Sequence, residues 1–214
     1  QRWPLREWTD AQIDRLHRTS AGNPFVLGEL VAMGTVADDD SPVVLPRRVI
    51  ELVQRHLQTL SPAGRAAVDA SAVLARPAPL PQLCAVAAPD DEAAFVRGCD
   101  EALAADVLVA GPAGLPWRHH PVREGALQAL PPARRAWLHG RAAEQLQQLP
   151  HVDPLTVAAH CDAAGDRAQA LPWLMRAAGQ QKDRGRFGDA QALWRRVADE
   201  AADPALALRA RLAI

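Results

Sequence analysis

The residue types best suited to chemistry in this chain gather in one segment, Trp117-Arg118-His119-His120-Pro121-Val122-Arg123-Glu124. A helical pattern follows it, from Gly125 to Leu130. The free N–H groups at the start of a helix favour an anion, and a histidine there can add a donor or a positive charge. The segment therefore predicts a place where an imidazole meets an anion. In the alternative interpretation, which spacing alone favours, one of the two histidines only packs or caps the helix.

Two elements must position this segment. A short apolar run, Val107-Leu108-Val109-Ala110, comes before it, and the turn Gly111-Pro112-Ala113-Gly114 separates the two. This order predicts a small β-hairpin over 107–120 whose second strand delivers a histidine to the helix. Several helices followed by such a two-stranded wing predict a winged-helix domain. The earlier helical patterns open at Pro46, at Pro62 behind a Ser61 cap, and at Asp90-Asp91-Glu92.

Composition predicts a helical, globular protein. The chain has 214 residues, 49% of them hydrophobic, and a net charge of −1. That length fits one large or two small domains, and the balanced charge gives no overall attraction to nucleic acid or to an anionic membrane. Alanine and leucine dominate and tyrosine is absent, which favours helices over strands. No apolar run approaches the roughly 20 residues of a membrane-spanning helix.

The three cysteines indicate a reducing compartment. Cys84, Cys99 and Cys161 are widely spaced and form no CxxC pair and no zinc spacing, so we expect buried thiols in a cytoplasmic protein. The first residues do not form a signal peptide. Because the chain opens on Gln1 and not on methionine, we expect a fragment of a longer protein.

The first 35 residues predict two short helices joined by a sharp turn. Thr9 is suited to cap the first helix, which places Ile13 and Leu16 on one face. Gly22-Asn23-Pro24 then breaks this helix, because the residue before a proline leaves the helical region, and the proline opens the second helix. The polar stretch that follows, around Asp38-Asp39-Asp40, has no helical periodicity and predicts a linker.

From Pro131 onward the pattern is helical throughout. The turn Gly165-Asp166-Arg167-Ala168-Gln169-Ala170-Leu171 echoes Gly188-Asp189-Ala190-Gln191-Ala192-Leu193. Such repetition predicts antiparallel helices stacked in series. Gly185-Arg186-Phe187-Gly188-Asp189-Ala190, with Trp194 four residues later, resembles the turn and second helix of a tetratricopeptide (TPR) unit. A generic helical bundle is the alternative. The helices are predicted to open at Pro131-Pro132, at Asp153-Pro154, after Gly165, at Phe187 and at Pro204.

Several catalytic classes lack their residues here. Lys182 is the only lysine, and it does not stand in a Gly-Lys-Ser/Thr context, so these residues hold no P-loop. There is no HExxH motif, and the histidines at 119–120, 139 and 160 lack a convincing metal spacing. His160 and Cys161 are neighbours that would not face each other on a helix. We therefore expect no catalytic residue, no metal site and no enzyme activity in the chain itself.

A winged helix often binds DNA, but the expected recognition helix of this one is acidic. Phosphates would repel such a helix in a DNA groove. The expected wing tip, residues 111–115, adds no basic residue. We therefore expect no direct DNA binding by this chain. The acidic residues of the helix region are Asp90, Asp91, Glu92, Asp100, Glu101 and Asp106, against a single Arg97.

Residues 117–125 resemble the winged-helix motif of signal-transduction ATPases with numerous domains, the STAND class. In large ATP-binding LuxR-type regulators this motif is an aromatic residue, Arg, His, a variable residue, Leu, Val, Arg, Glu and Ala; Pro121 and Gly125 depart from it. His119 takes the place of the family histidine that meets the β-phosphate of ADP. The turn at 22–24 resembles the family's Gly-x-Pro, whose proline packs on adenine. The resemblance implies nucleotide-binding roles for Gly22, Asn23, Pro24 and His119.

The same resemblance covers nearly the whole chain and implies its organisation. Residues 1–35 would be the end of a small helical lid subdomain and 36–45 a linker. Residues 46–130 would be the winged-helix domain, and 131–214 the start of a TPR-like superhelix. The nucleotide-binding core would then lie upstream of Gln1. ATP or ADP is accordingly expected in the parent protein, and no nucleotide in this fragment alone.

The implied function is a regulatory switch, held off by ADP and turned on by ATP and an inducer, in a cytoplasmic transcription regulator. Its partners would be the upstream nucleotide-binding domain and an inducer or protein on the helical repeats, with no DNA and no membrane contact. The parent protein could oligomerise on activation. The alternative function is a non-catalytic winged-helix and TPR-like scaffold that binds other proteins.

Overall fold

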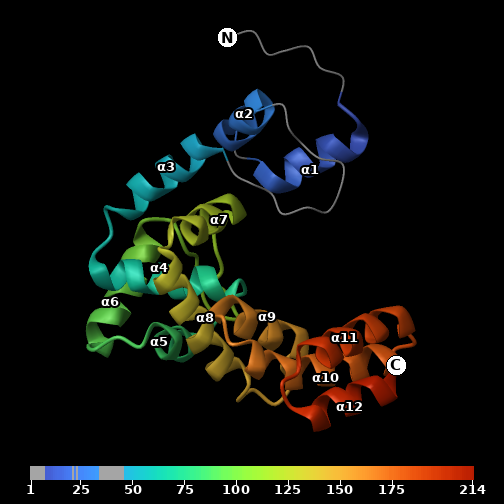
Figure 1. The fold of residues 1–214 in the computed structure, drawn as a ribbon. Coiled ribbons are helices and arrows are strands. Elements are labelled where there is room, and N and C mark those ends of the chain that lie inside the picture. The colour runs from blue at the N-terminus through green and yellow to red at the C-terminus, as the bar shows by residue number, and fades with distance from the viewer. Residues whose placement is uncertain (1–7, 21, 23, 34–45) are drawn as a thin grey trace. The chain divides into compact units, whose positions relative to one another are not determined.

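A computed structural model describes residues 8–20, 22, 24–33 and 46–214 (Figure 1). Within these residues the chain is mainly helical, with twelve helices and no β-sheet. The prediction of a mainly α protein is therefore confirmed. The chain forms two compact units, Gln1–Pro131 and Pro132–Ile214. None of the helices described is long and apolar enough to cross a membrane.

The first unit contains seven helices among its described residues. α4 lies against α5, α6 and α7, and α3 packs on α7. α1 and α2 pack on each other, and α1 also contacts α7. The predicted linker at 36–45 lies outside the described residues. The helices are α1 (Asp10–Ser20), α2 (Pro24–Met33), α3 (Arg47–Leu57), α4 (Pro62–Leu74), α5 (Leu80–Ala87), α6 (Glu92–Ala104) and α7 (His120–Ala129).

Side-chain caps explain where several of these helices begin. Before α1, the backbone N–H of Thr9 donates to the side chain of Gln12, and the N–H of Gln12 donates to the Thr9 hydroxyl. This reciprocal pair satisfies two donors at once. The Ser61 hydroxyl accepts the N–H of Gly64, the third residue of α4, at 3.1 Å. The Asp91 carboxylate accepts the N–H of Ala94, the third residue of α6, at 2.9 Å. The predicted caps at Thr9 and Ser61 are confirmed.

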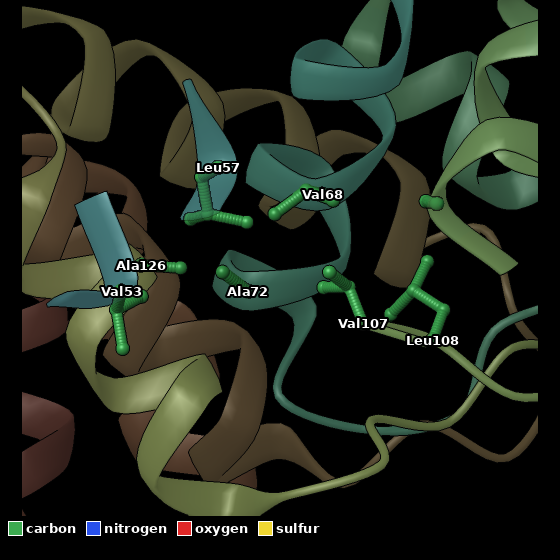
Figure 2. Close-up of a cluster of buried hydrophobic side chains, with 8 residues drawn as sticks. Val53, Leu57, Val68, Ala72, Val107, Leu108 and Ala126 are labelled. Carbon is green, nitrogen blue, oxygen red and sulfur yellow. The ribbon is translucent and has the colours of Figure 1, made fainter. Parts of the chain in front are cut away.

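One buried cluster holds α7 in place within the first unit. Figure 2 shows its side chains converging from α3, α4, α7 and the segment after α6. Removal of such side chains from water stabilises the fold, by about 25 cal/mol for each Å² buried. The start of α7 is therefore fixed relative to α3, α4 and residues 107–108. The cluster consists of Val53, Leu57, Val68, Ala72, Ala102, Val107, Leu108 and Ala126.

The predicted β-hairpin at 107–120 is wrong in its extent. The segment reverses direction as expected, but it holds only two isolated antiparallel bridges, Leu108 with Trp117 and Gly111 with Gly114. Two hydrogen bonds join its arms around the first bridge, from Arg118 N–H to the Val107 carbonyl, at 3.1 Å, and from Val109 N–H to the Pro116 carbonyl, at 2.9 Å. Gly111 and Gly114 exchange two more at the tip, at 2.9 and 3.2 Å. The segment is therefore a bridged turn over 107–118 and not a pair of strands.

Two features explain why a longer ladder does not form. Pro112 and Pro116 have no N–H to donate, and proline is therefore rare inside paired strands. The return arm also bonds elsewhere, because the N–H of Leu115 donates to the Ala78 carbonyl at 3.1 Å. Gly114 lies so close to this loop that a Cβ there would stand 2.1 Å from the Ala78 oxygen. The turn is thus held against the connection between α4 and α5.

The second unit is a row of helices. Each helix packs on the next one in the sequence, which agrees with the predicted helical array. Asp153, Asp166 and Asp203 cap three of the helices with their carboxylates. Gly165 and Gly185 end two of them with positive φ angles of 85° and 75°, a conformation that glycine adopts without strain. The helices are α8 (Pro132–Leu146), α9 (Pro154–Ala164), α10 (Arg167–Asp183), α11 (Phe187–Glu200) and α12 (Pro204–Ala213).

Two glycines allow α4 and α6 to approach closely. A Cβ on Gly98 of α6 would lie 2.4 Å from the carbonyl carbon of Ala63 and 2.5 Å from the nitrogen of Gly64, both in α4. The backbones therefore touch at this point with no room for a methyl group. The Glu101 carboxylate, one turn further along α6, accepts the N–H of Ser61 at 2.9 Å and also bonds its hydroxyl.

We predict that Gly98→Ala destabilises the first unit. The added methyl group has to push two backbones apart, and overpacking of this kind lowers the free energy of unfolding by about 1–3 kcal/mol. Gly179→Ala in α10 is the matched control, because a Cβ there meets nothing within 4 Å. In a helix interior that change stabilises by about 0.5–1 kcal/mol. Urea denaturation of both variants measures the difference, and an unchanged unfolding free energy for Gly98→Ala would contradict the close crossing.

Candidate functional site

His119 stands immediately before α7, at the end of the bridged turn. Its backbone is extended, with φ −135° and ψ 125°, and its side chain makes no capping hydrogen bond to the helix. The side chain is half-buried. The ring is therefore not used for the local role that histidines often have at a helix start. It remains available for a contact with another group.

The start of α7 offers fewer free N–H groups than the sequence suggests. Pro121 has none, and the N–H groups of Val122 and Arg123 donate to the carbonyl of His119, at 3.1 and 3.3 Å. Anion binding at a helix start depends on such N–H groups being free. An anion in this region would therefore depend chiefly on side-chain donors.

Arg123 fastens α7 to the end of α4. One guanidinium nitrogen donates to the Ala72 carbonyl at 3.0 Å, and the other bonds the carboxylate of Glu124. The side chain is only 14% exposed. The last carbonyls of a helix lack partners within the helix, so this arginine satisfies one of them. The arginine and glutamate of the motif therefore have a structural role in addition to any contact with a ligand.

Gly125 brings α7 close to α3. A Cβ at this position would lie 3.0 to 3.2 Å from three atoms of the Val53 side chain. Such distances are tighter than almost all real Cβ contacts, so alanine would require Val53 to move. The glycine at this position, where the resembling family has alanine, is thereby explained by packing.

A cavity of about 160 Å³ opens beside the start of α7. His120, the first residue of α7, lines it, whereas His119 does not. The Nε1 atom of Trp117, another lining residue, is buried and has no hydrogen-bond partner among the described residues. The sequence analysis assigned the anion contact to His119, which does not line this cavity. No signal in the sequence points to Arg76 as a lining residue. The lining residues are Ala75, Arg76, Pro77, Pro116, Trp117, His120 and Arg123.

The other predicted nucleotide residues lie in the turn between α1 and α2. Gly22 is exposed and has a φ of 76°, a conformation that favours glycine. Pro24 is the exposed first residue of α2, and Asn23 lies outside the described residues. α1 packs on α7, but no hydrogen bond or ion pair of the described residues joins Gly22 or Pro24 to His119. The structure therefore does not connect the two parts of the predicted site directly.

The second unit contains a histidine pair that sequence reasoning dismissed. Nδ1 of His139 in α8 lies 2.9 Å from Nδ1 of His160 in α9, so one ring donates a hydrogen bond to the other. Burial, followed by the nearby charges of His160 and Arg135, lowers the pKa of His139 from 6.5 to about 4. His139 is therefore neutral at physiological pH. Among the described residues no group of three or more possible metal ligands is found.

The thiols are shielded from reaction. Burial raises the pKa of the Cys99 thiol to about 11, with further contributions from Asp100 and Cys84. Burial also raises the pKa values of Cys84 and Cys161. Because the thiolate is the reactive form, these cysteines are poor nucleophiles at neutral pH. All three are free thiols.

No protein-family model, no curated protein and no solved structure matches this chain. A functional conclusion therefore has to come from the residues and from their geometry.

We predict that the second unit loses stability as the pH falls from about 6.5 to about 4. The folded-state pKa of His139 is depressed, so over this interval the unfolded chain binds more protons at this residue than the folded chain does. Below the folded pKa the loss is complete. Hydrogen exchange in α8 and α9 at a series of pH values measures the effect.

The matched variants are His139→Gln and His151→Gln. The first removes the depressed histidine and should reduce the loss of protection at acidic pH. The second changes an exposed histidine between α8 and α9 and should leave the loss unchanged. Equal acid sensitivity in all three proteins would show that the pair is not responsible.

Proposed function

We propose that this chain is the regulatory part of an ATP/ADP-switched signal-transduction protein of the STAND class, a cytoplasmic transcription regulator. In this proposal residues 46–130 form a winged-helix-like sensor of bound nucleotide, in which the bridged turn takes the place of the wing. Residues 131–214 form TPR-like helices that bind an inducer or a protein partner. The nucleotide-binding core is supplied by residues outside this chain.

The position of His119 carries the proposal. The bridged turn leads directly to this residue, its side chain does not cap α7, and the ring is half-buried at the edge of a packed unit. A group held in this way can donate to a phosphate oxygen without first breaking a bond to its own helix. Its position in the sequence motif is that of the phosphate-sensing histidine in the family that residues 117–125 resemble.

The packing of α7 supports a role in transmission. Arg123 ties α7 to the end of α4, and Gly125 seats it against Val53 of α3. A displacement of His119 would therefore also shift α7 against the helices α3 and α4. A nucleotide can act as a switch only if it contacts two states of the protein differently. ADP held by His119 would stabilise the closed state and so keep the protein off.

Pro24 is proposed to pack on the adenine ring, with Gly22 and Asn23 forming its turn. Its exposure at the first position of α2 supports this role, because the ring is free to meet a flat apolar group. The nucleotide would then touch both the α1–α2 turn and His119. ATP or ADP is the only cofactor in the proposal, and it is bound jointly with the nucleotide-binding core.

The surface of α6 argues against DNA as a partner of this chain. Asp91, Glu92 and Asp100 are exposed on or beside this helix, and Arg97 is itself paired with Asp91, 4.0 Å away. A phosphate backbone would be repelled by such a surface. The output of the parent protein is therefore proposed to come from another domain.

A scaffold function is the second candidate, and one observation favours it. A cavity of about 310 Å³ lies between α8, α9 and the start of α10. Trp137, on its wall, is 43% exposed, and small residues such as Gly140 and Ala164 also line it. An exposed tryptophan beside a depression with both apolar and charged walls, the latter including Arg141 and Glu144, is suited to a protein-binding surface. In this candidate the helices bind a partner and no nucleotide is sensed.

We predict that His119→Ala weakens ADP binding in the chain extended upstream through the proposed ATPase core. Loss of one hydrogen bond to a charged group lowers affinity by roughly 10- to 100-fold. The extended protein should co-purify with ADP, and the variant should co-purify with little ADP. The variant should also have a higher basal regulatory activity, measured without inducer. Denaturation followed by chromatography identifies and quantifies the nucleotide.

The control for this experiment is His151→Ala, an exposed histidine of the second unit, which should retain ADP. Equal ADP in the parent protein and in His119→Ala would reject the sensor role of this residue. If the folded parent and variants all lack nucleotide, the scaffold function is favoured instead.

A further inference from the structure

The cavity beside α7 is built from three separate segments of the first unit. Arg76 comes from the connection between α4 and α5, Trp117 from the end of the bridged turn, and His120 and Arg123 from α7. The cluster in Figure 2 and the bond from Arg123 to Ala72 fix these segments relative to one another. The cavity is therefore a formed feature of the fold and not a gap beside a loose loop.

Its charged lining residues carry one sign. Arg76 and Arg123 are cations, His120 can become one, and among the described residues no acidic side chain lines the cavity. Glu124 stands next to it, bonded to Arg123, with its carboxylate 3.7 Å from Nε2 of His120. One carboxylate cannot neutralise two guanidinium groups. The cavity therefore keeps a positive charge.

Several of its donors are not used up by the protein. One guanidinium nitrogen of Arg76 donates to Gln82 at 3.0 Å, which leaves other N–H groups among the five that arginine has. The buried indole N–H of Trp117 has no partner among the described residues. Buried tryptophan N–H groups nearly always find an acceptor. Trp117 lines the cavity, but its buried Nε1 is out of reach of a water-sized molecule, so its N–H serves as a nearby reporter and not as a ligand.

The volume limits what can enter. About 160 Å³ is well below the roughly 300 Å³ at which pockets enclose a drug-sized ligand, but it exceeds the space of several waters at about 30 Å³ each. A small ion or the end group of a larger molecule fits these limits. Two arginines and a histidine, from two segments of the chain, match an acceptor that has several oxygens.

We propose that this cavity binds a phosphate group through Arg76 and His120, beside the ring of Trp117. Arg123 contributes charge while it also holds α7 to α4. The phosphate is either free inorganic phosphate or the end of a phosphorylated small molecule such as a nucleotide. The site is distinct from the proposed nucleotide sensor, because His119 does not line the cavity.

The test is titration of the 214-residue chain with inorganic phosphate, followed through the indole N–H resonance of Trp117 in a ¹⁵N-labelled sample. Trp117→Phe identifies that resonance. A saturable shift is expected with phosphate and none with sodium chloride at the same ionic strength. Arg76→Gln and His120→Gln should each weaken binding roughly tenfold or more, whereas Arg97→Gln, at an exposed position of α6, should have no effect.

Further ligands and one variant separate the explanations. ADP that binds more tightly than phosphate, with the same dependence on Arg76, identifies a nucleotide phosphate as the source; equal or weaker binding identifies free phosphate. His119→Ala should leave phosphate binding unchanged, so that failure of the sensor proposal and failure of this one are distinguishable. Acetate that binds as tightly as phosphate, a shift that never saturates, or an equal shift in folded Arg76→Gln overturns the proposal.

Discussion

The seating of α7 on α3 and α4 is the contact on which the first unit depends. Apolar burial around Val53 and Ala126 supplies most of the attraction, but it has little direction. Direction comes from the Arg123 bond to the Ala72 carbonyl and from the absence of a side chain at Gly125. Together they set both the depth and the rotation of α7, and therefore the position of the histidines at its start.

In this arrangement the two adjacent histidines have different surroundings. His119 ends the bridged turn, while His120 begins the helix and borders the cavity. His119 has an extended backbone, whereas His120 is the first helical residue, so the two side chains leave the chain in different conformational settings. Adjacent imidazoles therefore serve different surroundings. The motif in the sequence contains two possible contacts, one for the proposed sensor and one for the proposed phosphate cavity.

Local signals in the sequence predicted the helices well, since caps and prolines act within a few residues. Pro62, behind the Ser61 cap, and Pro204 begin helices where expected. Long-range features were not predicted. Arg76 and Trp117 line one cavity only because the fold brings them there. Ile13, which was predicted to share a face with Leu16, is 50% exposed. The predicted hairpin did not form because Pro112 and Pro116 have no N–H to donate, and because the N–H of Leu115 donates to the Ala78 carbonyl.

The histidine pair could have been found from sequence. Seven residues separate His139 from the end of α8, and six separate the start of α9 from His160. These distances are similar, and antiparallel neighbouring helices bring such positions close together. The spacing rules for metal ligands within one helix do not detect a pair of this kind.

Serial packing in the second unit has a consequence for its motions. α12 packs on α11, whereas each of α9, α10 and α11 packs on a helix on both sides. In such a row the free energy of opening is close to a sum over neighbouring contacts, so α12 opens at the lowest cost and opening proceeds inward along the row. A molecule that binds α12 would thereby raise the free energy of opening at this end of the row.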